Sequence, residues 1–240
     1  MSDPPSFSVV LPTYNERGSL QALDARMRSA VGPRGGEILV VDDSSPDGTA
    51  AFVRDLARTG PYRLLSRAAR LGLASAVLEG IGHAAADVVV VMDADGSHPP
   101  EAIPSLVEPL LSGQAEFVLA SRHLPGASSE GLSGGRRVVS QGAQLLARPL
   151  TRVTDPMSGY FAFHRRILER ATLAPTGYKI ALEILVRCRP SPVREVPYVF
   201  APRLAGESKL GGDQVGQYLR HLGRLYAFRL VGSMRADRTR

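Results

Sequence analysis

Short, continuously apolar runs recur along the first half of the chain, and segments with apolar residues at helical spacing lie between them. Runs without polar alternation are typical of strands that are buried on both faces of a parallel sheet. Strands that alternate with helices in this rhythm indicate βαβ units. The pattern therefore predicts an α/β fold with a mainly parallel central sheet flanked by helices. We expect strands at residues 7–11, 37–41, 62–65, 88–93 and 117–120, and helices at 19–31, 47–57, 73–84 and from 99 onward.

The pattern changes after residue 122, where a stretch rich in Gly and Ser predicts a loop over 123–135. Strands and helices then alternate less regularly. We predict helices at 136–150, 167–172 and 180–188, strands at 161–163 and 193–200, and a turn and a polar loop at 154–159 and 203–212.

The last predicted helix, at 214–231, is basic and amphipathic. Val215, Leu219, Leu222 and Leu225 fall near one face, and arginines lie elsewhere around the helix. Such a helix can lie in a membrane interface or pack on the rest of the protein, and the pattern leaves both open. We expect the tail from residue 233 to be disordered. The chain thus divides into a main domain over 1–212 and a C-terminal helix and tail over 213–240.

Two carboxylates, Asp93 and Asp95, follow the apolar run that begins at Val88. Ligands of open α/β sheets bind outside the carboxyl ends of the strands, so both carboxylates are predicted to lie at a binding site. Hard oxygen ligands suit Mg²⁺ or Mn²⁺, which would bring a diphosphate with it. The alternative is that the two residues cap the following helix, because Asp is a favoured N-cap.

Two further polar clusters follow predicted strands, PTYNE at 12–16 and VDDSSPDGT at 41–49. The carboxyl ends of parallel strands meet at one edge of the sheet, so we expect these clusters to line the same crevice as Asp93 and Asp95. Carboxylates there can accept hydrogen bonds from a base or from ribose hydroxyls. Asp42, Asp43 and Asp47 could instead serve the turn, and for Asp47 we favour that interpretation.

The chain of 240 residues carries a formal net charge of +6 and has a pI near 9.9. Such a charge favours nucleic acid, an anionic membrane face or phosphorylated substrates as partners. Arginines that converge on one site bind phosphate bidentately, whereas any one alone is more often a solvated surface residue. One cysteine, no visible secretory signal and no apolar run of about 18 residues favour a cytoplasmic protein without a transmembrane segment. The candidate phosphate-binding residues of the second half are Arg122, Arg136, Arg137, Arg203 and Lys209.

Six motifs, taken in order, carry a resemblance to a known family: PTYNE (12–16), VDDSSPDGT (41–49), DAD (93–95), SGY (158–160), GYKI (177–180) and GESKL (206–210). The chain resembles glycosyltransferase family 2, and within it the dolichol-phosphate (polyprenol-phosphate) mannose synthases. The resemblance spans roughly residues 7–210. The DAD motif is common by itself, whereas the ordered set is specific.

The resemblance implies a GT-A (Rossmann-like) catalytic domain and an inverting transfer of mannose from GDP-mannose to a dolichol or polyprenol phosphate, with Mg²⁺ or Mn²⁺. The residues that it implies for the nucleotide sugar are Pro12, Tyr14, Glu16, Val41, Asp43, Asp93, Ala94, Asp95, Arg203 and Lys209. Those that it implies for the acceptor phosphate are Arg122, Arg136 and Ser140, those for the metal are Asp93, Asp95 and Ser97, and those for catalysis are Asp95 and Arg122.

The sequence departs from the family's pattern in two places. Ser97 stands where Gln is common, which leaves the metal preference open. Arg70 and Ala74 stand where Lys and Gly are common. His98 could act as a base, but its place in a helix-starting turn favours a role in orienting Asp95 or the turn.

Other functions remain open at this point. The same fold could use another nucleotide sugar, such as UDP-glucose, or another acceptor. A sugar nucleotidyltransferase would have a glycine-rich loop after the first strand, where PTYNE stands instead. A non-catalytic nucleic-acid-binding protein fits the pI but not the acidic strand ends, so we expect no nucleic-acid partner. A lipid acceptor implies peripheral contact with the membrane surface, made directly by the C-terminal helix or through a membrane-protein partner.

Overall fold

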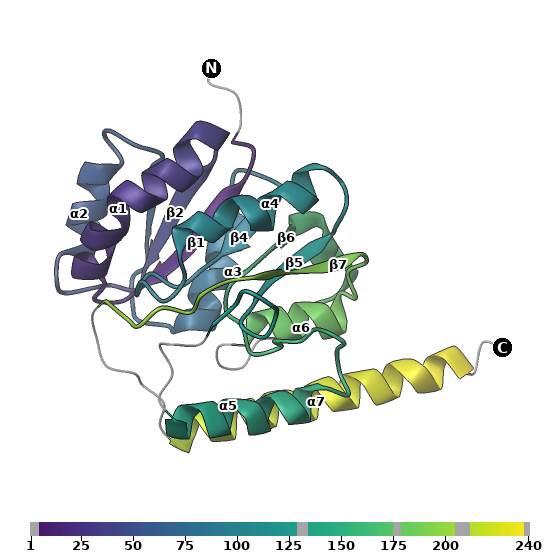
Figure 1. The fold of residues 1–240 in the computed structure, drawn as a ribbon. Coiled ribbons are helices and arrows are strands. Elements are labelled where there is room, and N and C mark those ends of the chain that lie inside the picture. Colours follow the sequence, from purple (N-terminus) through teal and green to yellow (C-terminus); the bar gives the residue numbers. More distant parts are fainter. Residues whose placement is uncertain (1–4, 129–133, 175–178, 205–211, 238–240) are drawn as a thin grey trace.

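A seven-stranded sheet with the order β3-β2-β1-β4-β6-β5-β7 forms the centre of the protein (Figure 1). The structure, a computed structural model, describes residues 5–128, 134–174, 179–204 and 212–237, and it describes the backbone alone at 134–140, 212–214 and 231–237. The strands are β1 (Ser8–Thr13), β2 (Glu37–Asp42), β3 (Tyr62–Ser66), β4 (Val88–Val91), β5 (Phe117–Ser121), β6 (Phe161–His164) and β7 (Val193–Pro197). The α-helices are α1 (Arg17–Val31), α2 (Thr49–Leu56), α3 (Leu73–His83), α4 (Ile103–Leu111), α5 (Gly134–Ala147), α6 (Ile180–Arg187) and α7 (Gly212–Asp237).

The sheet is parallel except at β6, which runs antiparallel to both of its neighbours, β4 and β5. The prediction of a mainly parallel sheet flanked by helices is therefore confirmed. The antiparallel strand brings the turn before it, at residues 154–159, to the same edge as the carboxyl end of β4, because Val91 pairs with Phe161 at the start of β6.

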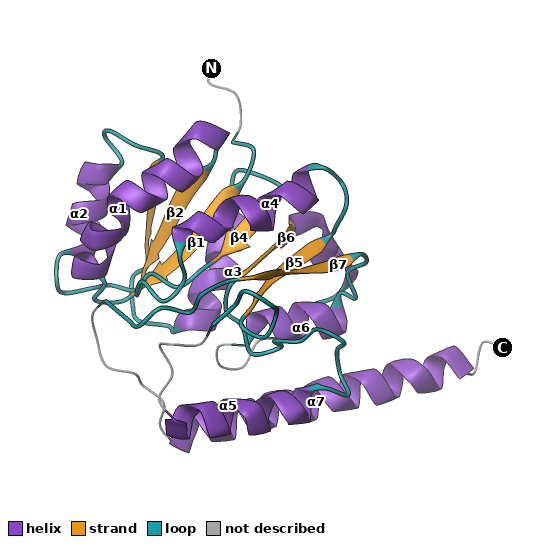
Figure 2. Ribbon diagram, in the orientation of Figure 1, coloured by secondary structure: helices purple, strands orange, loops and turns teal. Residues whose placement is uncertain are grey.

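Both faces of the sheet are buried along β1, β2, β4, β5 and β6, as the continuous apolar runs predict, whereas the edge strands β3 and β7 are partly exposed. Along β4, Val88 and Val90 pack into one core with α1, α2 and α4, whereas Val89 and Val91 pack into a second core with α3 and α6. Neighbouring strands alternate in the same way, and the two layers of helices are visible on either side of the sheet in Figure 2. This arrangement explains why polar alternation is absent from the strands.

Several predicted boundaries were wrong. The strand predicted to end at Asp93 ends at Val91, so both site carboxylates lie in the loop after β4. The helix predicted from 99 begins as a 3₁₀ turn (Pro100–Ala102), and the short helix predicted at 167–172 is a 3₁₀ helix (Arg165–Arg170). The strand predicted at 193–200 ends at Pro197. The helix α5 begins at Gly134 and ends at Ala147, and α7 continues to Asp237, which corrects the expectation of a disordered tail from 233.

Helices α5 and α7 lie side by side below the sheet, against α6 (Figure 1). Leu222 and Leu225 of α7 are buried against α5 and α6, but Val215 and Leu219 are about half exposed. The single apolar face predicted for α7 is therefore divided between a packed side and an open side. None of the described helices is long and apolar enough to cross a bilayer.

Candidate active site

The three polar clusters, at residues 12–16, 41–49 and 93–95, meet at the carboxyl ends of β1, β2 and β4. This is the lower edge of the sheet in Figure 1. Pro12 and Val41 are register partners across β1 and β2, and both are buried. Tyr14 and Glu16 follow directly in the turn after β1. The site that the sequence predicts from separate strand ends is thus brought together along one edge.

Asp43 is held from two sides at the β2 end of this edge. The guanidinium of Arg67 forms an ion pair with one carboxylate oxygen, and the backbone N–H of Gly72 donates to the other at 2.9 Å. The Arg67 and Asp43 side chains are only 3% and 6% exposed. Arg67 also bonds to Glu79 and Ser75, so it ties the strand end to α3. The sequence reasoning missed Arg67, although its place directly after the third predicted strand could have indicated it.

The neighbouring acidic residues of the same loop serve the turn. Asp42 accepts hydrogen bonds from the backbone and the hydroxyl of Ser45, at 3.0 and 2.6 Å. Asp47 accepts hydrogen bonds from Arg17 and Thr49 at the start of α1 and α2, as the favoured interpretation predicts. Asp43 is the residue of the three that faces the loop carrying Gly72.

Tyr14 and Glu16 face the other parts of the site. The guanidinium carbon of Arg70 lies 3.9 Å from the centre of the Tyr14 ring, which is a cation–π contact beside the carboxyl end of β1. Burial raises the pKa of Glu16, and the nearby charges of Asp95 and Asp93 raise it further, against the hydrogen bond from Ser19. Glu16 therefore lies within electrostatic reach of Asp93 and Asp95, in the loop after β4.

Asp95 is buried, and both of its carboxylate oxygens have partners. Oδ1 accepts the backbone N–H and the hydroxyl of Ser97, at 2.9 and 2.6 Å, and Oδ2 lies 2.9 Å from Nε of Arg203. Arg203 lies in the irregular segment after β7, which is held beside the site because Leu204 N–H donates to the Asp95 carbonyl at 2.9 Å. Gly96, with φ of 86°, lies under this segment, and a Cβ there would come within 2.5 Å of Leu204.

Asp93, two residues earlier in the same loop, is half-buried. Burial raises its pKa, as does the charge of Asp95, while His98, Arg203 and Lys179 act in the opposite direction. The half-buried Asp93 and the buried Asp95 lie within electrostatic reach of each other, and together with the Ser97 hydroxyl they offer oxygen ligands only. That set fits a hard divalent cation such as Mg²⁺ or Mn²⁺, which would offset the repulsion between them.

His98 stabilises the turn that contains both carboxylates. Its Nδ1 accepts the backbone N–H of Asp93 at 2.9 Å, and its ring stacks on Tyr160 with the centroids 4.9 Å apart. Burial lowers its pKa, so the imidazole is neutral at pH 7 with its second nitrogen protonated. The predicted orienting role of His98 thus agrees with the structure at the backbone of Asp93, rather than at Asp95.

Arg122, at the end of β5, forms the basic side of the site. It binds Asp155 bidentately, with Nε and Nη2 2.7 and 2.8 Å from the two carboxylate oxygens. Its guanidinium carbon lies 5.5 Å from the centre of the Phe200 ring. Although burial acts to lower the pKa of Arg122, the hydrogen bonds and charge of Asp155 raise it. Asp155 is a residue that the sequence reasoning missed, because only the antiparallel entry of β6 brings its loop beside β5.

The remaining predicted residues are placed less fully. Ala94 is a buried core residue between the two carboxylates. Arg136, Arg137 and Ser140 lie on α5, where the structure describes the backbone and not these side chains. Lys209 and Tyr178 lie outside the described residues.

Comparison with known proteins gives a consistent result. A family model described as "Glycosyl transferase family 2" matches residues 8–172. The "Dolichol-phosphate mannosyltransferase" of Pyrococcus furiosus is 42% identical over 91% of this chain, and the match spans 63% of that protein's length. The protein of the same name from Saccharomyces cerevisiae is 39% identical over 93% of this chain and 88% of its own. The "Polyprenol monophosphomannose synthase" of Mycolicibacterium smegmatis is 36% identical over 86% of this chain and 82% of its own.

Solved structures show the same fold. A glucosyl-3-phosphoglycerate synthase from Mycobacterium tuberculosis, crystallised with Mn²⁺, UDP and phosphoglyceric acid, is 25% identical with a TM-score of 0.68, over 94% of this chain and 78% of its own. A mannosyl-3-phosphoglycerate synthase from Rubrobacter xylanophilus is 19% identical with a TM-score of 0.69, over 96% and 75% of the two chains. The predicted GT-A fold is thereby confirmed.

Proposed function

The chain belongs to glycosyl transferase family 2, and we propose that it transfers mannose from GDP-mannose to the phosphate of a dolichol or another polyprenol, with inversion. One observation of the structure carries the proposal. Two arginines lie near the acidic pair, since Nε of Arg203 is 2.9 Å from Oδ2 of Asp95 and Arg122 is within electrostatic reach of His98, which accepts the Asp93 N–H. A site of this kind suits two phosphorylated substrates that must meet.

The donor half of the site comprises the ends of β1 and β2 and the loop after β4. Pro12, Val41 and the Arg67-supported Asp43 would line the nucleoside, with Tyr14 and Glu16 beside it. Asp93, Asp95 and Ser97 would hold Mg²⁺ or Mn²⁺. Such an ion, when bound, would neutralise the leaving diphosphate and act as a Lewis acid. Arg203 would then turn from Asp95 to the diphosphate, and Lys209 is a further donor-binding residue that the family resemblance implies.

The acceptor half centres on Arg122, with Arg136 and Ser140 on α5. The acceptor is a phosphate monoester with a second pKa of about 6, so it is largely a dianion at neutral pH. Its oxygen attacks the anomeric carbon directly, a new C–O bond forms on the opposite face, and the bond to GDP breaks. The reaction thus needs no strong general base, which fits a neutral His98 whose Nδ1 is already engaged. Positioning and charge neutralisation supply most of the rate.

A lipid acceptor requires contact with a membrane surface, and α5 and α7 are suited to it. Leu145 and Leu146 on α5, and Leu219 and Leu230 on α7, are between 48% and 64% exposed. Exposed arginines, including Arg220, share the same helix pair. A basic surface with protruding leucines favours binding to anionic lipid. We infer that the protein is cytoplasmic and binds the membrane peripherally through this helix pair, and a membrane-protein partner is the alternative.

A matrix of donors and acceptors tests the proposed function. Radiolabelled GDP-mannose and UDP-glucose are each offered with polyprenyl phosphate in detergent and with 3-phosphoglycerate. The second acceptor is included because a structural relative was crystallised with phosphoglyceric acid. We expect label in the organic phase with GDP-mannose and polyprenyl phosphate only. If UDP-glucose is used in preference to GDP-mannose, the proposed donor is wrong. If label appears on 3-phosphoglycerate, the proposed acceptor is wrong.

A further inference from the structure

Helix α7 is joined to α5 by polar contacts to which the proposed function gives no role. Three side chains of α7 donate hydrogen bonds to backbone carbonyl groups of α5 or of the turn after it. The pairs are Tyr218 with Ala143 at 2.6 Å, Tyr226 with Leu146 at 2.7 Å, and Arg229 with Pro149 and Leu150 at 2.9 and 2.8 Å. The residue numbers rise together in the two helices, so α5 and α7 run in the same direction.

Two of these donors lie at the C-terminal end of α5. The last carbonyls of an α-helix lack an intrahelical partner, and this end of a helix carries a partial negative charge. Leu146, the partner of Tyr226, lies in the last turn of α5, and Arg229 bonds to the turn that follows. An arginine in this place satisfies carbonyl groups and complements the helix dipole. Arg229 therefore caps α5 from another helix.

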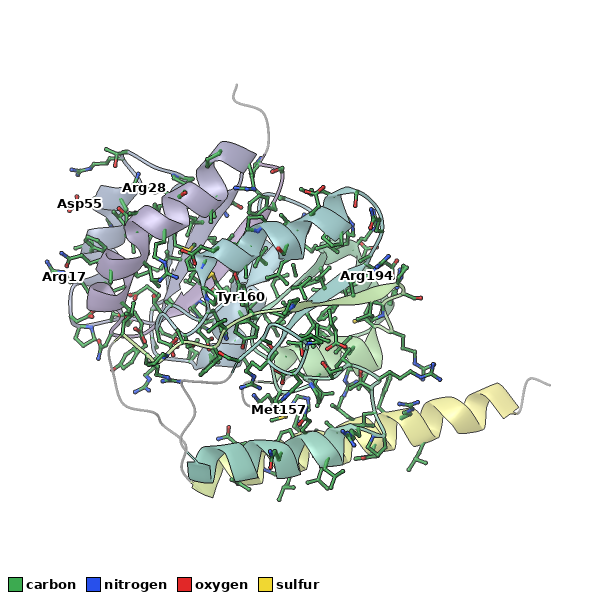
Figure 3. The ribbon with its side chains drawn as sticks, viewed as in Figure 1. Arg17, Arg28, Asp55, Met157, Tyr160 and Arg194 are labelled. Atoms are coloured by element: carbon green, nitrogen blue, oxygen red, sulfur yellow. The ribbon has the colours of Figure 1, made fainter. Side chains whose placement is uncertain are left out.

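Apolar packing also holds the two helices together, but it is less directional. Ala147 and Met157 lie in one cluster with α6 and with Leu222 and Leu225 of α7. Figure 3 shows Met157 between Tyr160, in the main body, and α5. Apolar contacts allow one helix to slide along another, whereas hydrogen bonds to particular carbonyls fix its place along the axis. The polar contacts therefore set where α5 lies along α7.

The proposed acceptor site has one part that is anchored to the sheet and one that is not. Arg122 is held by Asp155, and the N–H of the preceding Thr154 lies 2.9 Å from Oε1 of Glu195 on β7. The other acceptor residues of the proposed function lie on α5, which meets this part where Gln144 donates to the Thr154 carbonyl. The place of α5 relative to Arg122 therefore depends on what holds α5.

We propose that Arg229 is a positioning residue, which holds α5 where Arg136 and Ser140 can bind the acceptor phosphate together with Arg122. The proposal rests on the proposed function, in which these three residues bind that phosphate. Helix α7 then has a second task besides membrane contact, because it completes the acceptor half by acting through α5. The donor residues lie on β1, β2 and the loop after β4, so loss of Arg229 should leave the use of the donor nearly unchanged.

Two substitutions test the position of α5 without opening the core, because Arg229 is exposed. Arg229→Met keeps an aliphatic side chain and removes the charge and the donors, whereas Arg229→Lys keeps a charged donor. The acceptor is a short-chain, water-soluble prenyl phosphate without detergent or vesicles, so that membrane binding plays no part. We expect its KM to rise about threefold to thirtyfold in the Met variant and to stay within about twofold in the Lys variant. The KM for GDP-mannose should stay within about twofold in both.

The matched control is Arg54→Met, which removes an exposed arginine from the last turn of α2. This helix lies far from α7, as the position of Asp55 shows in Figure 3. The control should change neither KM, and melting temperatures show that all variants are folded. If a folded Arg229→Met variant keeps the wild-type acceptor KM, or if the KM values of donor and acceptor change equally, the proposal is wrong.

A chain that already lacks the acceptor groups of α5 gives a sharper test. In a variant that combines Arg136→Met with Ser140→Ala, the further change Arg229→Met should raise the acceptor KM by less than about twofold. The reason is that α5 then has no phosphate contact left to misplace. If the two effects multiply instead, Arg229 does not act through α5 and the proposal is overturned.

Amide hydrogen exchange gives a readout that needs no turnover. Arg229→Met should speed exchange in α5 and leave β1 and β4 unchanged, and Arg229→Lys should restore the slow exchange in α5. Unchanged exchange in α5 of the Met variant would contradict the proposal. Failure of the proposed function looks different, because the wild-type chain would then transfer no mannose to polyprenyl phosphate, while exchange in α5 would still respond to Arg229.

Discussion

Arg203 and Asp95 form an ion pair across the mouth of the site, with Nε of the arginine 2.9 Å from Oδ2 of the aspartate. The Arg203 side chain is 39% exposed, whereas that of Asp95 is 7% exposed. The guanidinium therefore covers an oxygen that a divalent cation would bind. Ion binding to Asp95 would therefore compete with the Arg203 pair, and the diphosphate of a donor would give Arg203 another partner.

Arg203→Gln should strengthen Mn²⁺ binding in the absence of nucleotide. A partly exposed ion pair contributes up to about 1 kcal/mol, so its removal should lower the dissociation constant of Mn²⁺ about threefold to fivefold. Titration of free Mn²⁺ by electron paramagnetic resonance measures this. The same variant should bind GDP more weakly. An unchanged Mn²⁺ affinity would show that the pair does not compete with the ion.

Arg67→Met should destabilise the fold far more than an exposed substitution does. The change leaves Asp43 and Glu79 without their partner, and breaking a buried ion pair costs about 3–5 kcal/mol. Urea denaturation followed by circular dichroism measures the loss in the free energy of unfolding. Arg58→Met is the matched control, because its pair with Asp55 is 79% and 70% exposed and should contribute less than about 1 kcal/mol. Equal losses in the two variants would contradict a structural role for Arg67.

Leu145→Glu combined with Leu219→Glu should abolish binding to anionic liposomes. Both side chains are exposed on the α5–α7 pair, so the change removes apolar contacts and adds negative charge without opening the core. Co-sedimentation with phosphatidylglycerol vesicles measures binding, and turnover of a short-chain soluble acceptor should be unaffected. The control is Leu111→Glu, a change at a half-exposed leucine on α4. Binding that depends on an added membrane protein would favour the partner alternative.

The local pattern predicts what lies within one strand or helix. The apolar run from Val88 predicts a buried strand, and the structure has β4 there, with Asp93 and Asp95 in the loop after it. The partners of these residues depend on the topology of the sheet. Asp155 reaches Arg122 because β6 enters antiparallel between β4 and β5, a direction that no periodicity reveals.

In helix α7, too, the sequence pattern predicts the element but not its packing. Its apolar residues predict an amphipathic helix, but period alone does not say which of them meet a partner helix. Leu225 is fully buried against α5 and α6, whereas Leu219, on what looked like the same face, is 51% exposed. The difference arises from the α5–α7 pairing, which joins segments far apart in the sequence.

The most direct test of the proposed chemistry is the transfer of radiolabelled mannose from GDP-mannose into extractable polyprenyl phosphate, with and without a divalent cation. We expect transfer with Mg²⁺ or Mn²⁺, its loss on chelation, its return when either ion is added back, and none by a folded Asp95→Asn variant. Near-normal turnover under chelation, or by the variant, would contradict a site in which Asp93 and Asp95 hold a divalent cation for the transfer of mannose.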